Sequence, residues 1–127
     1  MLEYPSDTAG GIMATEFLTV KEDMTMDETI AYLRKMAPDY QTPYYVYVVD
    51  DDNILKGVVQ LRQILTCNSD TKIKDEMITS VISVDVNTDQ EEVAVLFEKY
   101  GFASMPVVDE KNNEILGVIT FDDIMNV

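Results

Sequence analysis

An internal repeat with an offset of 64 residues is the feature that most constrains the fold of this chain. Two pairs of segments match at that spacing: 17–20 (FLTV) with 81–84 (VISV), and 25–36 (TMDETIAYLRKM) with 89–100 (DQEEVAVLFEKY). The longer segments both begin with a helix N-cap residue and carry Glu three positions later, Thr25 with Glu28 and Asp89 with Glu92. In such a capping box, side chains satisfy the free amides of a helix start. The repeat therefore predicts two copies of one supersecondary unit.

The apolar residues of the two longer segments have helical spacing. In the second copy they fall at i, i+3, i+4 and i+7, as Val93, Leu96, Phe97 and Tyr100. In the first copy the same stripe is formed by Ile30, Leu33 and Ala37. Both segments are therefore predicted to be amphipathic helices. Gly101 is expected to end the second helix in the left-handed conformation, and Pro38 is expected to stop the first.

Each predicted helix is followed by the pattern of a strand, an acidic turn and a second strand. The runs are 45–53 (YVYVVDDDN) and 105–113 (MPVVDEKNN), with second strands around 57–59 and 117–119, each leading into a short helix. Val, Ile and Tyr dominate the strands, as a half-buried sheet prefers. Asp and Asn are common turn residues, so the acidic turns are interpreted as solvated loops.

The expected fold is α/β (α+β), with two repeats of strand, helix, strand, strand, helix packed with pseudo-two-fold symmetry. Neither half of about sixty residues is large enough for a robust core, so the halves should pack together. The expected boundaries are a leading segment at 1–13, repeat 1 at 14–66, a linker at 67–78 and repeat 2 at 79–127. The linker carries a short amphipathic stretch, IKDEM.

The chain is strongly acidic: 24 Asp and Glu face 9 Lys and Arg, for a net charge of −15, and there is no histidine. Such a surface repels phosphate backbones and anionic lipids, so no nucleic-acid partner is expected. Without histidine the usual general base and zinc ligand are missing, and the donor set favours Mg²⁺ or Ca²⁺. A merely soluble acidic surface is the alternative. A single cysteine, Cys67, and apolar runs too short to cross a bilayer indicate a cytosolic setting.

Two strand-to-helix motifs carry a family resemblance. GVITFDD (117–123) places Gly117, Thr120 and Asp123 in the pattern of the CBS domain. GVVQLRQ (57–63) keeps the glycine of that pattern, Gly57, but has Gln60 and Gln63 at the other two positions. The chain thus resembles a tandem CBS pair, or Bateman module. In addition, YPSDTAGGIM (4–13) resembles the stretch that enters the CBS pair of MgtE-family magnesium transporters. That resemblance implies a non-catalytic cytosolic piece of an integral membrane protein, without its amino-terminal helical domain and its transmembrane pore.

The resemblance implies a regulatory role for Mg²⁺. It places magnesium ligands at Asp122, Asp123, Glu91 and Asn126, which would share ions with another domain or with a second copy in a homodimer. A purely structural alternative exists, because Thr120 and Asp123 have the spacing of a capping box. The first copy has Gln60, Arg62 and Gln63 at this place, so the fold itself does not require acids there.

CBS clefts also hold adenosine compounds, so the resemblance makes ATP a possible second ligand. The implied contacts are Tyr45 and Phe102 beside a base, Arg62 and Thr120 at phosphate, and Asp123 at ribose hydroxyls. Gln63 stands where the first copy would need its own ribose-binding aspartate, which weakens that site, and the net charge of −15 opposes a polyanion. The sequence has neither a Gly-rich phosphate loop nor a His- or Cys-based nucleophile, so it gives no indication of an enzyme.

Overall fold

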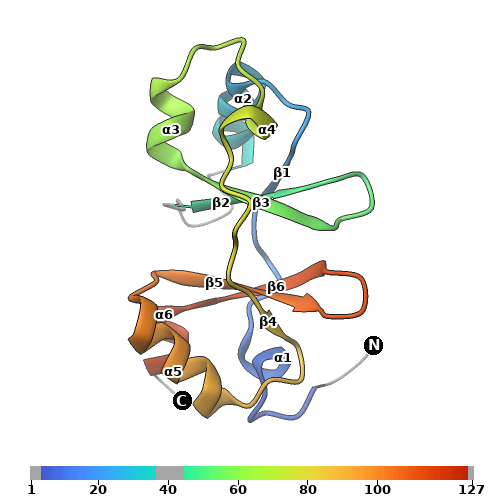
Figure 1. Ribbon diagram of the computed structural model, residues 1–127, viewed down its shortest axis with the longest axis vertical. Helices are drawn as coiled ribbons and strands as arrows, with labels where there is room; N and C mark the ends of the chain where they lie inside the picture. The colour runs from blue at the N-terminus through green and yellow to red at the C-terminus, as the bar shows by residue number, and fades with distance from the viewer. Residues whose placement is uncertain (1–3, 37–44, 126–127) are drawn as a thin grey trace. The chain divides into compact units, whose positions relative to one another are not determined.

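The structure, a computed structural model, describes residues 4–36 and 45–125. These residues form two compact units, each drawn as one sheet with its helices in Figure 1. Unit 1 takes in the residues up to Phe17 and those from Ile82 onward, whereas unit 2 is the continuous stretch Leu18–Val81. The chain therefore leaves unit 1, completes unit 2 and returns.

Unit 2 is built on a three-stranded sheet with the order β1-β2-β3. Its elements are β1 (Thr19–Lys21), α2 (Met26–Met36), β2 (Tyr45–Val49), β3 (Leu55–Gln60), α3 (Leu61–Thr66) and α4 (Ile73–Glu76). β1 runs parallel to β2, and β2 pairs antiparallel with β3. A parallel pair needs a crossover, which α2 supplies, whereas the antiparallel pair needs only the acidic turn.

Unit 1 repeats this topology with the sheet order β4-β5-β6. Its elements are α1 (Ala9–Ile12), β4 (Val84–Asp85), α5 (Gln90–Tyr100), β5 (Ser104–Asp109), β6 (Glu114–Thr120) and α6 (Phe121–Met125). β4 is parallel to β5, and β5 is antiparallel to β6. The predicted order of strand, helix, strand, strand, helix is confirmed in both units, and the fold class is mixed α/β.

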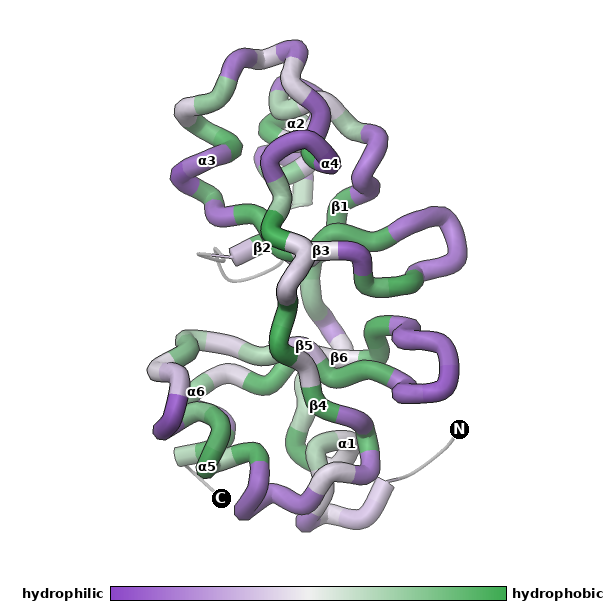
Figure 2. Tube along the Cα trace, in the orientation of Figure 1, coloured by the Kyte–Doolittle hydropathy of each residue, from purple (hydrophilic) through white to green (hydrophobic). Residues whose placement is uncertain are grey.

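Each unit has its own apolar core. In unit 2 the core includes Leu33, Val46, Val48, Val59, Ile64 and Ile73, and in unit 1 it includes Ala9, Val93, Phe97, Met105, Val107 and Ile119. Figure 2 shows the strands largely hydrophobic and the turns after β2 and β5 hydrophilic. The middle strands β2 and β5 are buried along nearly their whole length, which explains their continuous apolar sequences.

The helix ends follow the predicted chemistry with one difference. The amide of Thr25 donates to Glu28 Oε1 at 3.0 Å, and the amide of Glu28 donates to Thr25 Oγ1 at 3.1 Å, which confirms the first capping box. Asp89 caps α5 differently, because its Oδ2 accepts the amide of Glu91 at 3.0 Å and Glu92 does not reach back. Gly101 ends α5 with φ of 67°, as predicted. Ala37 and Pro38 lie outside the described residues.

In each unit, a segment that is not part of the sheet lies along its open edge, which is β3 in unit 2 and β6 in unit 1. Ile78 pairs with Val58 in unit 2, and Ala14 pairs with Val118 in unit 1. The preceding residues Gly57 and Gly117 allow this close approach, since a Cβ on them would stand 2.7 Å from Ile78 O and 2.9 Å from Ala14 O. Residues 4–14 and residues 71–78, called segment 4–14 and segment 71–78 below, thus cover sheet edges that would otherwise be unpaired.

Candidate ligand sites at the strand-to-helix junctions

The junction between β6 and α6 is a closed capping box. The amide of Thr120 donates to Asp123 Oδ2 at 3.1 Å, and the amide of Asp123 donates to Thr120 Oγ1 at 3.2 Å. The carboxylate also lies in the first turn of α6, where the helix dipole favours negative charge. Asp123 is half-buried, and its second oxygen has no partner among the described residues. The capping role that the spacing indicated is therefore present, and it uses one of the two carboxylate oxygens.

The junction between β3 and α3 forms the same box with neutral side chains. The amide of Gln60 donates to Gln63 Oε1 at 3.0 Å, and the side chain of Gln60 accepts the amide of Gln63. Sequence reasoning missed this box because it looked only for Thr, Ser and Asp at these positions. The presence of Gln at both the N-cap and N3 positions is the sequence pattern that would have revealed it. Capping at this junction therefore does not require a charged residue.

Asp122 lies inside the box of unit 1, between Thr120 and Asp123, and Arg62 holds the matching place in unit 2. Both side chains are exposed and have no hydrogen-bond or ion-pair partner among the described residues. Adjacent residues of a helix point about 100° apart, so Asp122 and Asp123 present oxygens in different directions. The pair is suited to contact two neighbours rather than to enclose one ion.

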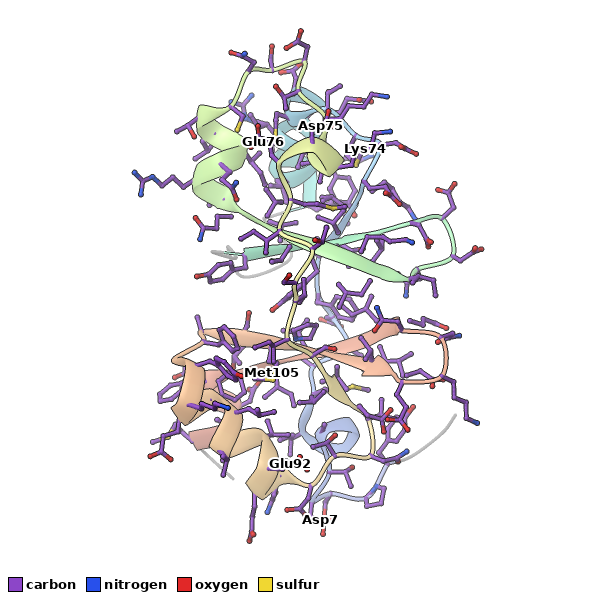
Figure 3. All side chains as sticks on the ribbon, viewed as in Figure 1. Asp7, Lys74, Asp75, Glu76, Glu92 and Met105 are labelled. Atoms are coloured by element: carbon purple, nitrogen blue, oxygen red, sulfur yellow. The ribbon has the colours of Figure 1, made fainter. Side chains whose placement is uncertain are left out.

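Glu91 lies at the other end of α5 from these carboxylates. The amide of Phe121 donates to Ala103 O at 2.9 Å, and the rings of Phe97 and Phe121 meet edge to face at 6.3 Å. The start of α6 is thus beside the C-terminal end of α5, about 14 Å along the helix from Glu91. Figure 3 shows Asp7 and Glu92 together near that first turn of α5.

No group of three or more acidic or Cys side chains converges on one metal position within residues 4–36 and 45–125. Asp122 and Asp123 lie together, Glu91 lies apart from them, and Asn126 is outside the described residues. Carboxylate oxygens suit Mg²⁺, which keeps several waters and needs only one or two protein carboxylates. The chemistry of Asp122 and Asp123 therefore fits Mg²⁺, with at most these two carboxylates supplied at the β6–α6 junction.

The candidate nucleotide contacts fall in different units. Tyr45 begins β2 opposite Gln60, which places it at the junction that carries Arg62. Phe102, Thr120 and Asp123 lie at the matching corner of unit 1, where Ser104 is opposite Thr120. The ring of Phe102 stacks on Tyr100 at a centroid distance of 5.2 Å. Each junction thus combines an aromatic side chain with polar groups.

The acidic turn after β2 is a structural loop, as its composition predicted. Asp50 Oδ1 accepts the amides of Ile54 at 3.0 Å and Asp52 at 2.9 Å. The hydrogen bond from Ile54 is the main reason that the pKa of the Asp50 carboxyl lies below its ordinary value of 3.8. Lys56 adds an ion pair at 3.8 Å. Both oxygens of the Asp50 carboxylate therefore have partners within or beside the turn.

No helix in the described part of the chain is long and apolar enough to span a membrane.

The paired topology and the capped junctions define the class of protein. The chain belongs to the CBS domain family, whose model matches residues 9–70 and again residues 71–127. It is therefore a tandem CBS pair, which confirms the resemblance found in its sequence.

Individual relatives narrow the comparison to the cytosolic region of magnesium transporters. The chain is 42% identical over 127 residues to the magnesium transporter MgtE of Thermus thermophilus, covering 100% of this chain and 28% of that protein. The MgtE of Enterococcus faecalis gives the same identity and coverage. A crystal structure of the cytosolic domain of the Mg²⁺ channel MgtE in complex with ATP is 43% identical, with a TM-score of 0.91, over 97% of this chain and 49% of that one. The chain spans little more than a quarter of these curated relatives.

Proposed function

We propose that this CBS pair is the cytosolic regulatory region of a magnesium transporter and that it senses Mg²⁺ through Asp122 and Asp123. It is a binding module rather than an enzyme, and it acts on the cytoplasmic side of the membrane. In the full-length protein it would be linked to an amino-terminal helical domain and to a transmembrane pore. Similarity to transporters along the whole chain supports this assignment.

One observation carries the proposal. Gln60 and Gln63 cap α3 with neutral side chains. Thr120 and Asp123 cap α6 with a carboxylate whose second oxygen has no hydrogen-bond partner among the described residues. Since a neutral box closes the same junction in unit 2, capping does not require the charge on Asp123, and its second oxygen is available as a ligand. The exposed carboxylate of Asp122 adds a second ligand that no described residue neutralises.

The proposed mechanism is electrostatic. A chain with a net charge of −15 repels a second copy of itself and any acidic neighbouring domain. Mg²⁺ bound at Asp122, Asp123 and Glu91 would bridge such surfaces and hold a homodimer and its attached domains compact, which closes the pore. When Mg²⁺ is scarce, the repulsion separates the surfaces. Asn126 would contribute a neutral amide oxygen to the same region.

Thermal melting of the chain in millimolar MgCl₂, against NaCl of equal ionic strength and against CaCl₂, tests the proposal. A ligand that binds only the folded state stabilises it by about 1.4 kcal/mol for each tenfold rise above Kd. The melting temperature should therefore keep rising with MgCl₂ after NaCl has saturated. If MgCl₂ and NaCl give equal curves, the sensor function of this pair is wrong.

The variant Asp122→Asn/Asp123→Asn should lose the Mg²⁺-specific part of the stabilisation. Its amide oxygen at position 123 can still accept the Thr120 amide, so the cap is kept. The matched control is Asp51→Asn/Asp52→Asn, which removes the same charge from exposed side chains of the turn. Sedimentation with and without MgCl₂ checks the proposed homodimer, and a monomer under both conditions would contradict it.

Binding of an adenosine nucleotide is the second candidate function. It is favoured by the structure of the MgtE cytosolic domain in complex with ATP, which this chain matches at 43% identity. Tyr45 and Arg62 at one junction, and Phe102, Thr120 and Asp123 at the other, are the proposed contacts. Calorimetry with ATP, ADP and AMP tests it, using Arg62→Gln as the variant. No heat at millimolar nucleotide would count against this function without affecting the Mg²⁺ proposal.

A further inference from the structure

Segment 4–14 and segment 71–78 are equivalent docking elements, related by the repeat offset of 64. Five main-chain hydrogen bonds of 2.8–3.0 Å hold the first on unit 1: Ala9 N to Thr88 O, Gly10 N to Val86 O, Gln90 N to Asp7 O, Ala14 N to Val118 O and Val118 N to Ala14 O. Five matching bonds of 2.8–3.0 Å hold the second on unit 2: Ile73 N to Met24 O, Lys74 N to Glu22 O, Met26 N to Thr71 O, Ile78 N to Val58 O and Val58 N to Ile78 O.

Beyond these shared bonds, segment 71–78 and the residues just before it are held more firmly. The amide of Asp27 donates to Ser69 O at 3.0 Å, whereas its counterpart, the amide of Glu91, is taken by the side chain of Asp89. The side chain of Lys74 also lies 3.7 Å from Asp23, an exposed pair that adds little. Figure 3 labels Lys74, Asp75 and Glu76 on α4.

A side-chain latch is present in unit 2 and has no counterpart among the described residues of unit 1. Gln63 Nε2 donates to Glu76 O, the last carbonyl of α4, at 3.3 Å. The matching residue in unit 1 is Asp123, whose carboxylate can only accept when ionised and so cannot latch the last carbonyl of α1. The residue that supplies a charge at the junction is therefore also the residue that removes the latch.

The buried anchors of the two segments differ in size. Ile73 and Ala9 occupy matching positions and both are fully buried. At this position the isoleucine removes several more carbon atoms from water than the alanine does. Elsewhere Tyr4, Ile12 and Met13 of segment 4–14 pack against the core of unit 1, and Met77 of segment 71–78 packs against that of unit 2. Gly10 and Gly11 further favour the undocked state of segment 4–14, because glycine loses the most freedom on ordering.

The two segments also differ in how far they can move once undocked. Segment 71–78 follows α3 within unit 2 and stays close to its docking position. Segment 4–14, with residues 15–17 after it, is separated by the whole of unit 2 from the rest of unit 1, which resumes at Ile82. An undocked segment 4–14 is therefore not held near its position by adjoining residues of the sheet that it docks on, whereas segment 71–78 is.

We propose that segment 4–14 is a strap that opens separately while the rest of unit 1 stays folded. Opening would break the two backbone hydrogen bonds between Ala14 and Val118 and so expose the edge of β6. Val118 lies two residues before Thr120, which precedes the first residue of α6. Segment 71–78 is the permanently closed counterpart. The pair thus contains one fixed and one releasable docking element on otherwise equivalent units.

Amide hydrogen exchange followed by NMR on the whole chain tests the strap, since the repeat supplies matched probes. Protection factors are compared for Ala9 with Ile73, Gly10 with Lys74, Ala14 with Ile78 and Val118 with Val58. The first member of each pair should be less protected by about tenfold or more. Val107 and Ile119 in the sheet of unit 1 should remain well protected.

Two outcomes overturn the proposal. Protection that agrees within about twofold across the matched pairs would show that both segments are equally fixed. Equally fast exchange at Val107 and Ile119 would show that unit 1 opens as a whole and has no separate strap.

Two variants test the latch in opposite directions. Gln63→Glu keeps the oxygen that caps Gln60 but removes the donor to Glu76, so exchange at Ile78 should rise severalfold. Asp123→Gln supplies the missing donor and should slow exchange at Ala14 without changing Ile78. Unchanged exchange in both variants would overturn the latch as the basis of the difference.

Discussion

Thr120 and Asp123 satisfy each other's backbone amides across the first turn of α6, with hydrogen bonds of 3.1 and 3.2 Å. This reciprocal pair fixes the carboxylate of Asp123 on one side and leaves its other oxygen available. Gln60 and Gln63 close the equivalent turn without charge. The two junctions therefore share their geometry and differ in electrostatics.

The first prediction concerns the stability of this cap. Thr120→Ala removes the acceptor for the Asp123 amide and should lower the free energy of unfolding by about 1 kcal/mol. Urea unfolding followed by circular dichroism measures the change. Thr15→Ala, at an exposed threonine without a hydrogen bond among the described residues, is the control and should leave the stability nearly unchanged.

The second prediction concerns the two glycines under the docking segments. Gly117→Ala and Gly57→Ala each place a Cβ within 3.0 Å of a backbone carbonyl oxygen, on Ala14 and Ile78. Because backbone must shift, each should cost about 1–3 kcal/mol in the free energy of unfolding. Gly101→Asn, at a left-handed position with no atom near the added Cβ, should cost less. Equal losses at all three positions would contradict the close-approach explanation.

The third prediction is a pH dependence at α2. Hydrogen bonding from the Thr25 amide is the main cause that holds the pKa of Glu28 below its ordinary value of 4.5. The unfolded chain therefore takes up a proton at a higher pH than the folded chain does. The stabilisation is present above pH 4.5 and is lost as the pH falls through the folded pKa.

Unfolding at a series of acidic pH values measures this effect. Glu28→Gln keeps an oxygen for the Thr25 amide and should flatten the pH dependence. Glu98→Gln removes one charge from an exposed residue of α5 and serves as the control. Identical slopes for the wild type and Glu28→Gln would rule out this linkage.

The fourth prediction concerns salt. A net charge of −15 destabilises the folded state through self-repulsion, so NaCl should raise the melting temperature until screening is complete. Asp51→Asn/Asp52→Asn should weaken this salt dependence. A melting temperature independent of NaCl would show that self-repulsion is unimportant, and it would also simplify the comparison with MgCl₂.

Much of the fold could be predicted because it rests on local chemistry that the chain uses twice. The capping box of Thr25 and Glu28 and the left-handed Gly101 are present as expected, and the amphipathic stretch IKDEM contains the short helix α4. The sequence did not reveal that Asp89 caps through Glu91, because several acceptors and amides compete at one helix start. The boundaries 1–13, 14–66, 67–78 and 79–127 remain predictions.

Less of the candidate site could be predicted. The pattern at Thr120 and Asp123 correctly indicated a cap, but the neutral cap at Gln60 and Gln63 was missed. The sequence predicts only a leading segment at 1–13 and a linker at 67–78, although Met13 and Met77 match at the repeat offset. The equivalence of segments 4–14 and 71–78 depends on hydrogen bonds between residues far apart in the chain, which local patterns do not contain. The ligand roles of Asp122, Asp123, Glu91 and Asn126 remain predictions, because no three acidic side chains converge within residues 4–36 and 45–125.

The crossing of the docking segments has a consequence for a chain with a single repeat. Segment 4–14 precedes the first repeat but completes the unit that holds the second, and segment 71–78 precedes the second repeat but completes the unit that holds the first. In this arrangement a lone repeat cannot finish its own sheet edge. A chain with a single repeat would need a second chain with which to exchange leading segments, as in domain swapping, whereas the tandem repeat supplies both partners in one polypeptide.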